Sequence, residues 1–290
     1  MNAAAMIAIP EELSETQRAA LVNLLADEDP AIYETVRKKI LSFGPRATNW
    51  LRPHLLSSDP ALRRRAQAIV LHFERMAADN RFLAFCVKNG QEFDLEQAGW
   101  LLAQTCYPEI NLEGYRALLD GYAEAIRERL AACAEPKSIL TKINRYLFSE
   151  LGITGNEDDY YDPENSYLNR VIDRRTGNPI SLSMVYILLA RRLRLPIVGI
   201  GLPGHFICRY QSTAEEIYID AFNRGKLLSK ADCIQYLLQG NYRLHEDYLA
   251  PVSPRRLMLR VCSNLHQIYR QHDPAEESTR LQRYLVALSR

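Results

Sequence analysis

The chain has 290 residues, 47% of them hydrophobic and 24% charged, values that are ordinary for a globular protein and allow one large domain or two to three small ones. Its 36 basic and 35 acidic residues leave a net charge of +1. This balance argues against general binding to nucleic acid or to a membrane surface, because both functions need a strong basic bias.

The six cysteines lie far apart, without a CxxC pair or a histidine at metal-ligand spacing. The sequence therefore predicts reduced thiols, most of them in the core, and gives no sign of a metal or organic cofactor. Residues 1–10 have no Lys or Arg ahead of their short apolar run, unlike a signal peptide. The longest apolar stretch, residues 180–190, is too short to span a membrane, and these features together predict a cytoplasmic protein.

Two similar segments near the N-terminus indicate a helical repeat. The pair Asp29-Pro30 recurs as Asp59-Pro60, and each pair predicts a helix start, because aspartate caps the first turn and proline fits the first helical position. Apolar residues follow the second pair at helical spacing, namely Leu62, Ala66, Ile69, Val70 and Phe73. We expect residues 1–78 to form HEAT-like helices, which serve as an adaptor or simply cap the next domain.

Helical patterns continue over residues 94–132, with a break at Tyr107-Pro108, where proline interrupts the backbone hydrogen bonds. A further helix is predicted from about Pro136 to just before Gly152. Residues 155–178 are polar and rich in turn formers. We expect this long irregular segment to be packed and ordered, because it carries several aromatic residues.

The strand signals follow one long apolar helix. That helix is predicted over residues 180–193, and the strands are predicted over residues 196–202, 206–211 and 216–220. The tail, residues 254–290, predicts two helices that separate at residues 272–274. The predicted fold is therefore α+β and dominated by helices.

Three polar residues on these elements follow the order nucleophile, base, orienting acid. Ser181 lies at the start of the predicted helix, His205 lies between the first two strands, and Asp220 ends the third. That order is the layout of papain-like and transglutaminase-like enzymes, with serine in place of cysteine. A serine needs a positioned base, which His205 would supply while Asp220 fixes its tautomer. Alternatively, Ser181 or Ser183 caps the helix, His205 stands in a turn and Asp220 only ends its strand.

Cys208 offers no replacement for the missing thiol. Side chains alternate between the two faces of a strand, so His205 and Cys208, three positions apart, point to opposite faces. We therefore expect Cys208 to lie in the core.

Longer motifs resemble the SirB-type transglutaminase-like family. The resemblance covers residues 93–272 and is carried by residues 144–148, 155–156, 160–169, 174–183 and 202–206. It implies a domain over residues 79–250, in which a papain-like helix packs on a small antiparallel sheet, and it matches His205 and Asp220 to two positions of the catalytic triad. Within the motifs, the candidate binding residues are Asn165, Tyr167, Asn169 and Arg174.

The sequence departs from transglutaminases at two places. Counted back from Leu195-Pro196, the cysteine position falls near residues 179–181, and the SirB-type pattern lacks that cysteine, so thiol chemistry does not transfer. The tail, residues 251–290, offers one helical hairpin that resembles a truncated first tetratricopeptide repeat. Bacterial members of the family often continue there into a repeat array, and related domains occur in a eukaryotic F-box protein.

Two functions follow from this pattern. The first is a transglutaminase-like domain that has lost acyl-transfer chemistry and binds a peptide or protein segment in its cleft. The second is a serine-dependent amide hydrolase or acyl transferase, with Ser181 as nucleophile, His205 as base and Asp220 as orienting acid. A scaffold without a functional cleft would leave the polar residues of the motifs without a purpose.

Overall fold

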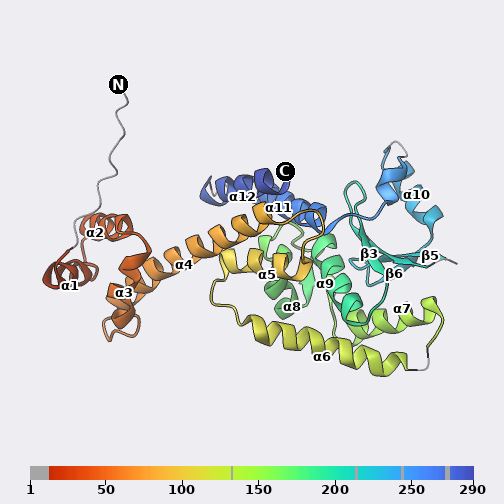
Figure 1. Cartoon of the computed structure of the whole chain (residues 1–290), viewed down its shortest axis with the longest axis horizontal. Helices are drawn as coiled ribbons and strands as arrows, with labels where there is room; N and C mark the ends of the chain where they lie inside the picture. The colour runs from red at the N-terminus through yellow and green to blue at the C-terminus, as the bar shows by residue number, and fades with distance from the viewer. Residues whose placement is uncertain (1–12, 132, 213–214, 243–244, 272–274) are drawn as a thin grey trace. The chain divides into compact units, whose positions relative to one another are not determined.

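A computed structural model describes residues 13–131, 133–212, 215–242, 245–271 and 275–290 (Figure 1). The chain divides into two compact units, Met1–Ala78 and Asp79–Arg290. The boundary falls within helix α4 (Pro60–Lys88). Two expectations, that residues 1–10 are unlike a signal peptide and that the C-terminal helices separate at residues 272–274, concern positions outside the described residues.

The first unit is helical. Its elements are α1 (Glu15–Leu24), α2 (Pro30–Ser42), α3 (Thr48–Leu51), the first part of α4, and 3-10 turns at Pro45–Ala47 and Arg52–His54. The Asp29 carboxylate accepts a hydrogen bond from the N–H of Ala31 at 2.8 Å, and the Asp59 carboxylate accepts one from Ala61 at 2.8 Å. The helix starts predicted from the two Asp-Pro pairs are therefore confirmed.

The apolar face of α4 forms the core of the first unit. The five residues predicted at helical spacing, from Leu62 to Phe73, are buried and cluster with Leu25, Ile40 and Leu51 of the preceding helices. Burial of such a stripe is the main stabilising contribution to a small helical unit.

The second unit contains most of the chain and all of the named strands. Its helices are the end of α4, α5 (Leu95–Cys106), α6 (Leu112–Leu130), α7 (Pro136–Asn144), α8 (Leu168–Arg174), α9 (Pro179–Arg192), α10 (Lys230–Gln239), α11 (Pro254–Gln271) and α12 (Ala275–Leu288). A π-helical turn at Arg145–Glu150 continues α7, and 3-10 turns lie at Pro163–Ser166 and Glu246–Leu249. The breaks between α5 and α6 and after α7 occur where the sequence predicts them.

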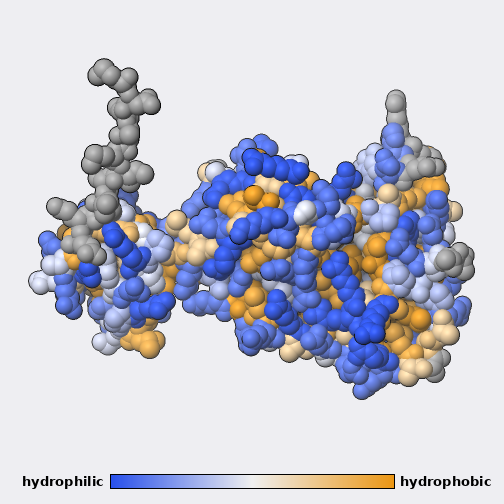
Figure 2. All heavy atoms as spheres, viewed as in Figure 1, coloured by the Kyte–Doolittle hydropathy of each residue, from blue (hydrophilic) through white to orange (hydrophobic). Residues whose placement is uncertain are grey.

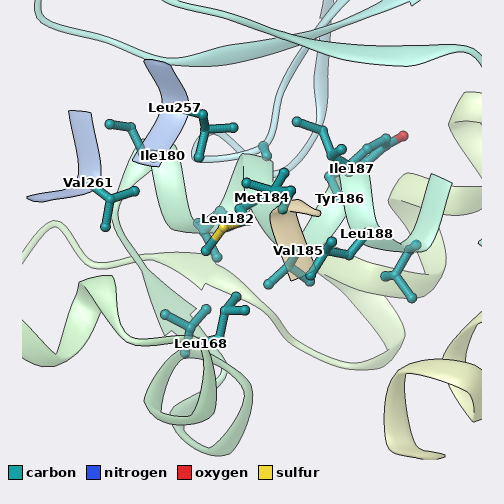
Figure 3. Packing of buried hydrophobic residues seen from close by; sticks show 14 of the residues in the cluster. Leu168, Ile180, Leu182, Met184, Val185, Tyr186, Ile187, Leu188, Leu257 and Val261 are labelled. Atoms are coloured by element: carbon teal, nitrogen blue, oxygen red, sulfur yellow. The ribbon is translucent and has the colours of Figure 1, made fainter. Parts of the chain in front are cut away.

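Helix α9 is the centre of this unit (Figure 1). Every residue from Pro179 to Ala190 is buried, because strands β3 and β4 (Ile197–Ile200 and Ile207–Gln211) cover one side and helices α6, α8 and α11 cover others. Figure 3 shows α9 side chains such as Leu182 packed between Leu168 of α8 and Leu257 of α11. A helix that is apolar on all sides is stable only when it is enclosed in this way.

The main sheet has the strand order β3-β4-β5-β6 and is antiparallel throughout. Strands β3, β4 and β5 (Glu216–Asp220) confirm the three predicted strands, and Cys208, paired with Gly199 and Ile219, is fully buried as expected. Strand β6 (Lys226–Leu228) was not predicted, because three residues beside a turn carry too little strand signal.

The segment 155–178 is ordered, but the expectation that it is irregular throughout is wrong. It contains helix α8, and its ends form a short parallel pair in which β1 (Thr154–Gly155) aligns with β2 (Thr176–Gly177). The turn-forming residues obscured α8, which has only seven residues and therefore too few turns to show a clear period.

The C-terminal helices belong to the same core as α9. Leu257, Val261 and Leu265 of α11 and Leu281 of α12 are buried in this cluster, so residues 251–290 do not stand apart from the second unit. The guanidinium of Arg255 donates to the carbonyl groups of residues that end two helices, Cys86 and Asn89 near the end of α4 and Ala287 and Leu288 in α12. One buried cation thus satisfies terminal carbonyl groups that would otherwise have no partner.

Hydrophilic residues cover much of the face in Figure 2, with apolar residues scattered between them. In the described part of the chain, no helix is both long enough and apolar enough to cross a bilayer. The six cysteines are free thiols.

Candidate functional site

Ser181 completes the cap at the start of α9. Its hydroxyl accepts a hydrogen bond from the N–H of Asn178 at 3.0 Å, and the Asn178 side chain accepts one from the N–H of Ser181 at 3.0 Å. The hydroxyl also lies 2.6 Å from the carbonyl oxygen of Asn165, to which it donates. Ser181 is fully buried, so its hydroxyl is engaged in a reciprocal capping box within the protein.

His205 and Asp220 form a pair beside this helix start. His205 follows the turn at Pro203-Gly204, Asp220 ends β5, and His205 Nε2 lies 2.8 Å from Asp220 Oδ2. Asn223 supports the same carboxylate, donating from its backbone N–H at 3.2 Å and from its side chain at 2.7 Å. When Nε2 donates to Asp220, Nδ1 carries the lone pair, and the ring can accept a proton or a hydrogen bond there.

The surroundings of Asp220 favour its ionised form. Burial raises the pKa of Asp220, but the hydrogen bond and positive charge of His205 and the bonds from Asn223 outweigh it, so the net pKa lies below the ordinary value. The ionised carboxylate fixes the orientation of the imidazole. The pair is therefore suited to hydrogen bonding in a fixed geometry.

Two neighbouring cavities meet at His205, and together we call them the His205 cleft. The first has a volume of about 580 Å³ and the second about 330 Å³. Both are lined by His205, Gly204, Tyr160 and Pro179. Pro179, the first residue of α9, is therefore the position of the helix start that faces both cavities, whereas Ser181 lines neither of them.

Aromatic rings surround His205 in the cleft. The ring centroids of Phe222 and Tyr236 lie 6.3 and 6.0 Å from the imidazole, and Tyr160 packs edge-on against Phe222 at 6.0 Å. Such rings offer flat apolar walls with polar edges, which suits contact with side chains and backbone of a bound segment.

One thiol, Cys233 of α10, lines the first cavity. Burial, together with the nearby charges of Asp232 and Asp220, raises the pKa of Cys233 to about 12. The thiol therefore stays protonated near neutral pH and is a poor nucleophile. Among the residues that the structure describes, no group of three or more His, Cys, Asp or Glu side chains is arranged to hold a metal ion.

The four candidate binding residues of the motifs line neither cavity of the His205 cleft. Arg174 forms ion pairs with Asp162 and Glu164 at 2.5 and 3.0 Å. Tyr167 is buried, and its hydroxyl accepts a hydrogen bond from the thiol of Cys106 at 3.1 Å. Asn169 is buried on α8. These side chains hold the segment 155–178 against the core.

Asn165 connects this segment to the site. Its side-chain amide donates to the carbonyl oxygens of Asp159 and Tyr160 at 2.8 and 3.3 Å, while its backbone carbonyl accepts from Ser181. The same buried residue thus fixes the start of α9 and the backbone of Tyr160 in the cleft. Asn165 is therefore a positioning residue.

Several residues that line the cleft were not predicted from the sequence. Tyr160 begins the motif 160–169 and Phe222 lies two residues after Asp220, and their aromatic character was the available signal. Tyr236 and Arg260 come from α10 and α11, far along the chain, and no local pattern marks them. Only the folded arrangement brings these side chains to His205.

A buried helix packed on a small antiparallel sheet, with a paired histidine and aspartate beside the start of the helix, defines a transglutaminase-like domain. Residues 113–263, more than half of the chain, match the family model of the transglutaminase-like superfamily. The chain therefore belongs to this superfamily. The matched residues include α9, the main sheet and most of the His205 cleft.

Curated relatives share the same region. A UPF0162 protein of Xylella fastidiosa (strain Temecula1) is 36% identical over 186 residues, which are 62% of this chain and 66% of that protein. A UPF0162 protein of Pseudomonas aeruginosa is 31% identical over 180 residues, covering 60% of this chain and 64% of that protein. F-box only protein 21 of Mus musculus is 37% identical over 135 residues, 44% of this chain and 21% of that protein. The chain thus matches about two thirds of the length of the bacterial relatives, and no solved structure matches it.

Proposed function

We propose that this transglutaminase-like chain binds a peptide or protein segment in the His205 cleft without acyl-transfer chemistry. One observation carries the proposal: the first two residues of α9, Pro179 and Ile180, line the cleft with His205, and neither has a nucleophilic atom. By the sequence resemblance, the missing cysteine falls near residues 179–181. Of these positions, Pro179 lines both cavities, Ile180 lines the second, and Ser181 lines neither. A histidine and aspartate without a nucleophile retain hydrogen bonding but not covalent catalysis.

The form of the cleft supports a segment of chain as the ligand. Two cavities that share His205 give a site of several hundred cubic ångströms, and aromatic rings, amides and charged groups line it together. The likeness of this region to F-box only protein 21 also favours a protein as the partner.

A peptide array tests the binding proposal directly. The full chain is labelled and incubated with an array of random decapeptides, and His205→Ala is compared with the wild type. We expect the wild type to select a defined set of peptides and His205→Ala to weaken the binding of that set about tenfold or more, because the central polar group of the cleft is lost. His54→Ala, in the first unit, is the matched control and should bind as the wild type does. Failure of the wild type to select any peptide set would refute the proposal.

A serine-dependent amide hydrolase is the second candidate, and the 2.8 Å contact between His205 and Asp220 is the observation that favours it. Ser181 would have to leave its cap to reach His205, at the loss of its bonds to Asn165 and Asn178. A serine-directed fluorophosphonate probe separates the two functions. We expect no labelling of the wild type between about pH 6 and 9, whereas labelling that disappears in Ser181→Ala would establish the hydrolase.

The flanking helices complete the proposal. We propose that the chain is a SirB-type member of the superfamily, that residues 1–78 are HEAT-like helices and that α11 and α12 correspond to a truncated tetratricopeptide repeat. Helical repeats of both kinds commonly present surfaces for protein contacts. Removal of residues 1–78 should then leave selection of peptides by the cleft unchanged while weakening binding of the intact partner.

A further inference from the structure

Arg260 is held rigidly at the edge of the second cavity. Its Nη2 donates to the carbonyl oxygens of Leu202 and His205 at 2.7 and 2.8 Å, and its guanidinium lies 5.4 Å from the centroid of the Phe206 ring. These contacts come from the same turn that carries the imidazole of His205. The guanidinium therefore has a fixed place in the His205 cleft.

The positive charge of Arg260 is not balanced by a carboxylate in the described part of the chain. The partly buried Arg192 of the same unit, by contrast, pairs with Glu96 at 2.7 Å and with Asp120 at 2.6 Å. Burial lowers the pKa of Arg260, while Tyr160 and Tyr236 oppose that shift, and arginine remains charged at neutral pH. A partly desolvated cation without a counter-ion attracts an anion more strongly than one exposed to water.

The two cavities differ in charge. Asp220, Asp232 and Lys226 line the first cavity. Among the described residues that line the second cavity none is acidic, and the lining includes Asn264 and Gln267 of α11 together with Arg260. The second cavity is therefore the part of the cleft that suits a negatively charged group, and the first cavity suits neutral or basic ones.

We propose that the second cavity binds a carboxylate of the partner segment, either an acidic side chain or a C-terminal carboxylate, and that Arg260 is the residue that selects it. This inference rests on the proposed function, because it names the chemistry of the segment bound in the His205 cleft. A carboxylate near Arg260 gains charge-assisted hydrogen bonds that the isosteric amide cannot form with equal strength. We therefore expect replacement of the selected carboxylate by an amide to weaken binding about 10- to 100-fold.

A positional-scanning hexapeptide library tests the inference. It is prepared with free and with amidated C-termini, and it is bound to the wild-type chain, to Arg260→Gln and to Arg260→Lys. We expect the wild type to enrich Asp and Glu at one position, or to require the free C-terminus, which distinguishes the two sources of the carboxylate. Arg260→Gln should lose that preference and Arg260→Lys should keep part of it, because lysine retains the charge but not the planar geometry.

A second measurement does not depend on the folding of a variant. The wild-type chain with ¹⁵N-labelled arginine is titrated with N-acetylglutamate and, as the neutral control, with N-acetylglutamine. A saturable shift of the Arg260 side-chain signal with the acid alone supports the inference. Equal shifts with both compounds, or none with either, would overturn it.

The outcomes separate the inference from the function on which it rests. Peptides that bind in a His205-dependent manner without any preference for acidic groups would overturn the role of Arg260 and leave the binding function intact. An acidic preference that is unchanged in Arg260→Gln would likewise overturn it. Absence of any selected peptide in the wild type would refute both.

Discussion

Replacement of Ser181 by alanine separates a helix cap from a nucleophile. The change removes a buried hydroxyl that accepts from Asn178 and donates to Asn165. The two backbone groups do not lose every partner, because the N–H of Asn178 also lies 3.3 Å from the carbonyl oxygen of Asn165. We therefore expect a loss of about 1–2 kcal/mol in the free energy of unfolding, the range for a lost cap, and not the larger sum for two unsatisfied buried groups.

The assay has to report on the second unit alone. Trp50 lies in the first unit and Trp100 is buried in the second, so a Trp50→Phe background confines the tryptophan signal to the second unit. For a unit of this size, about 1–2 kcal/mol corresponds to a decrease in Tm of about 2–8 °C. Urea unfolding followed by Trp100 fluorescence gives the free energy itself.

Ser183→Ala is the matched control on the same buried helix. Its hydroxyl makes one long contact, 3.4 Å to the carbonyl oxygen of Phe206, so we expect a loss below about 1 kcal/mol. Ser181→Ala should also keep its peptide binding once folded, because Ser181 lines neither cavity. Unchanged stability in Ser181→Ala together with lost peptide binding would refute the role of Ser181 as a cap.

Two further predictions concern the acid of the pair and the packing behind Phe222, a residue that lines the first cavity. The pKa of Asp220 lies below its ordinary value of 3.8, so its ionised form stabilises the folded chain above that pH and the contribution is lost as the pH falls through the lowered pKa. The free energies of unfolding of the wild type and of Asp220→Asn, measured in urea, should therefore differ most near neutral pH and converge below about pH 4. A difference that stays constant with pH would contradict this. A Cβ at Gly155 would lie 2.6 Å from the Phe222 ring, so Gly155→Ala should lower the free energy of unfolding in urea by about 1–3 kcal/mol. The control Gly121→Ala, on the exposed side of α6, should raise the free energy of unfolding by about 0.5–1 kcal/mol. Equal effects of the two glycine substitutions would show that the close contact at Phe222 is absent.

Local signals predicted much of the fold. Asp29 and Asp59 mark helix starts through cap chemistry, and the continuous apolar run of α9 predicts its burial, because both depend on neighbours in the sequence. The pairing of His205 with Asp220 was also predictable, since His205 lies two residues before β4 and Asp220 ends the adjacent antiparallel strand β5. Strand β6 and helix α8 were missed because short elements depend on tertiary contacts more than on their own periodicity.

The direction of side chains at the start of α9 could not be read from spacing alone. Positions 179 and 181 are two residues apart, which is about 200° around a helix, so only one of them can face His205. Sequence analysis favoured Ser181 because of its chemistry, whereas the folded chain turns Pro179 to the cleft and Ser181 to Asn165. Arg260 likewise joins the site from α11, because the C-terminal helices pack on the same core.

The alkylation of single introduced cysteines tests the central claim most directly, namely that position 179 faces His205 and position 181 does not. Iodoacetamide rates for Pro179→Cys and Ser181→Cys are measured by mass-spectrometric mapping of the labelled peptide, which distinguishes the introduced thiol from the six native ones. We expect Cys at position 179 to react at least about tenfold faster at neutral pH, with a pH midpoint below about 8.5 that rises in the His205→Ala background, because His205 stabilises the thiolate. Faster, His205-dependent alkylation at position 181 would contradict the account and make the serine the residue that faces the histidine.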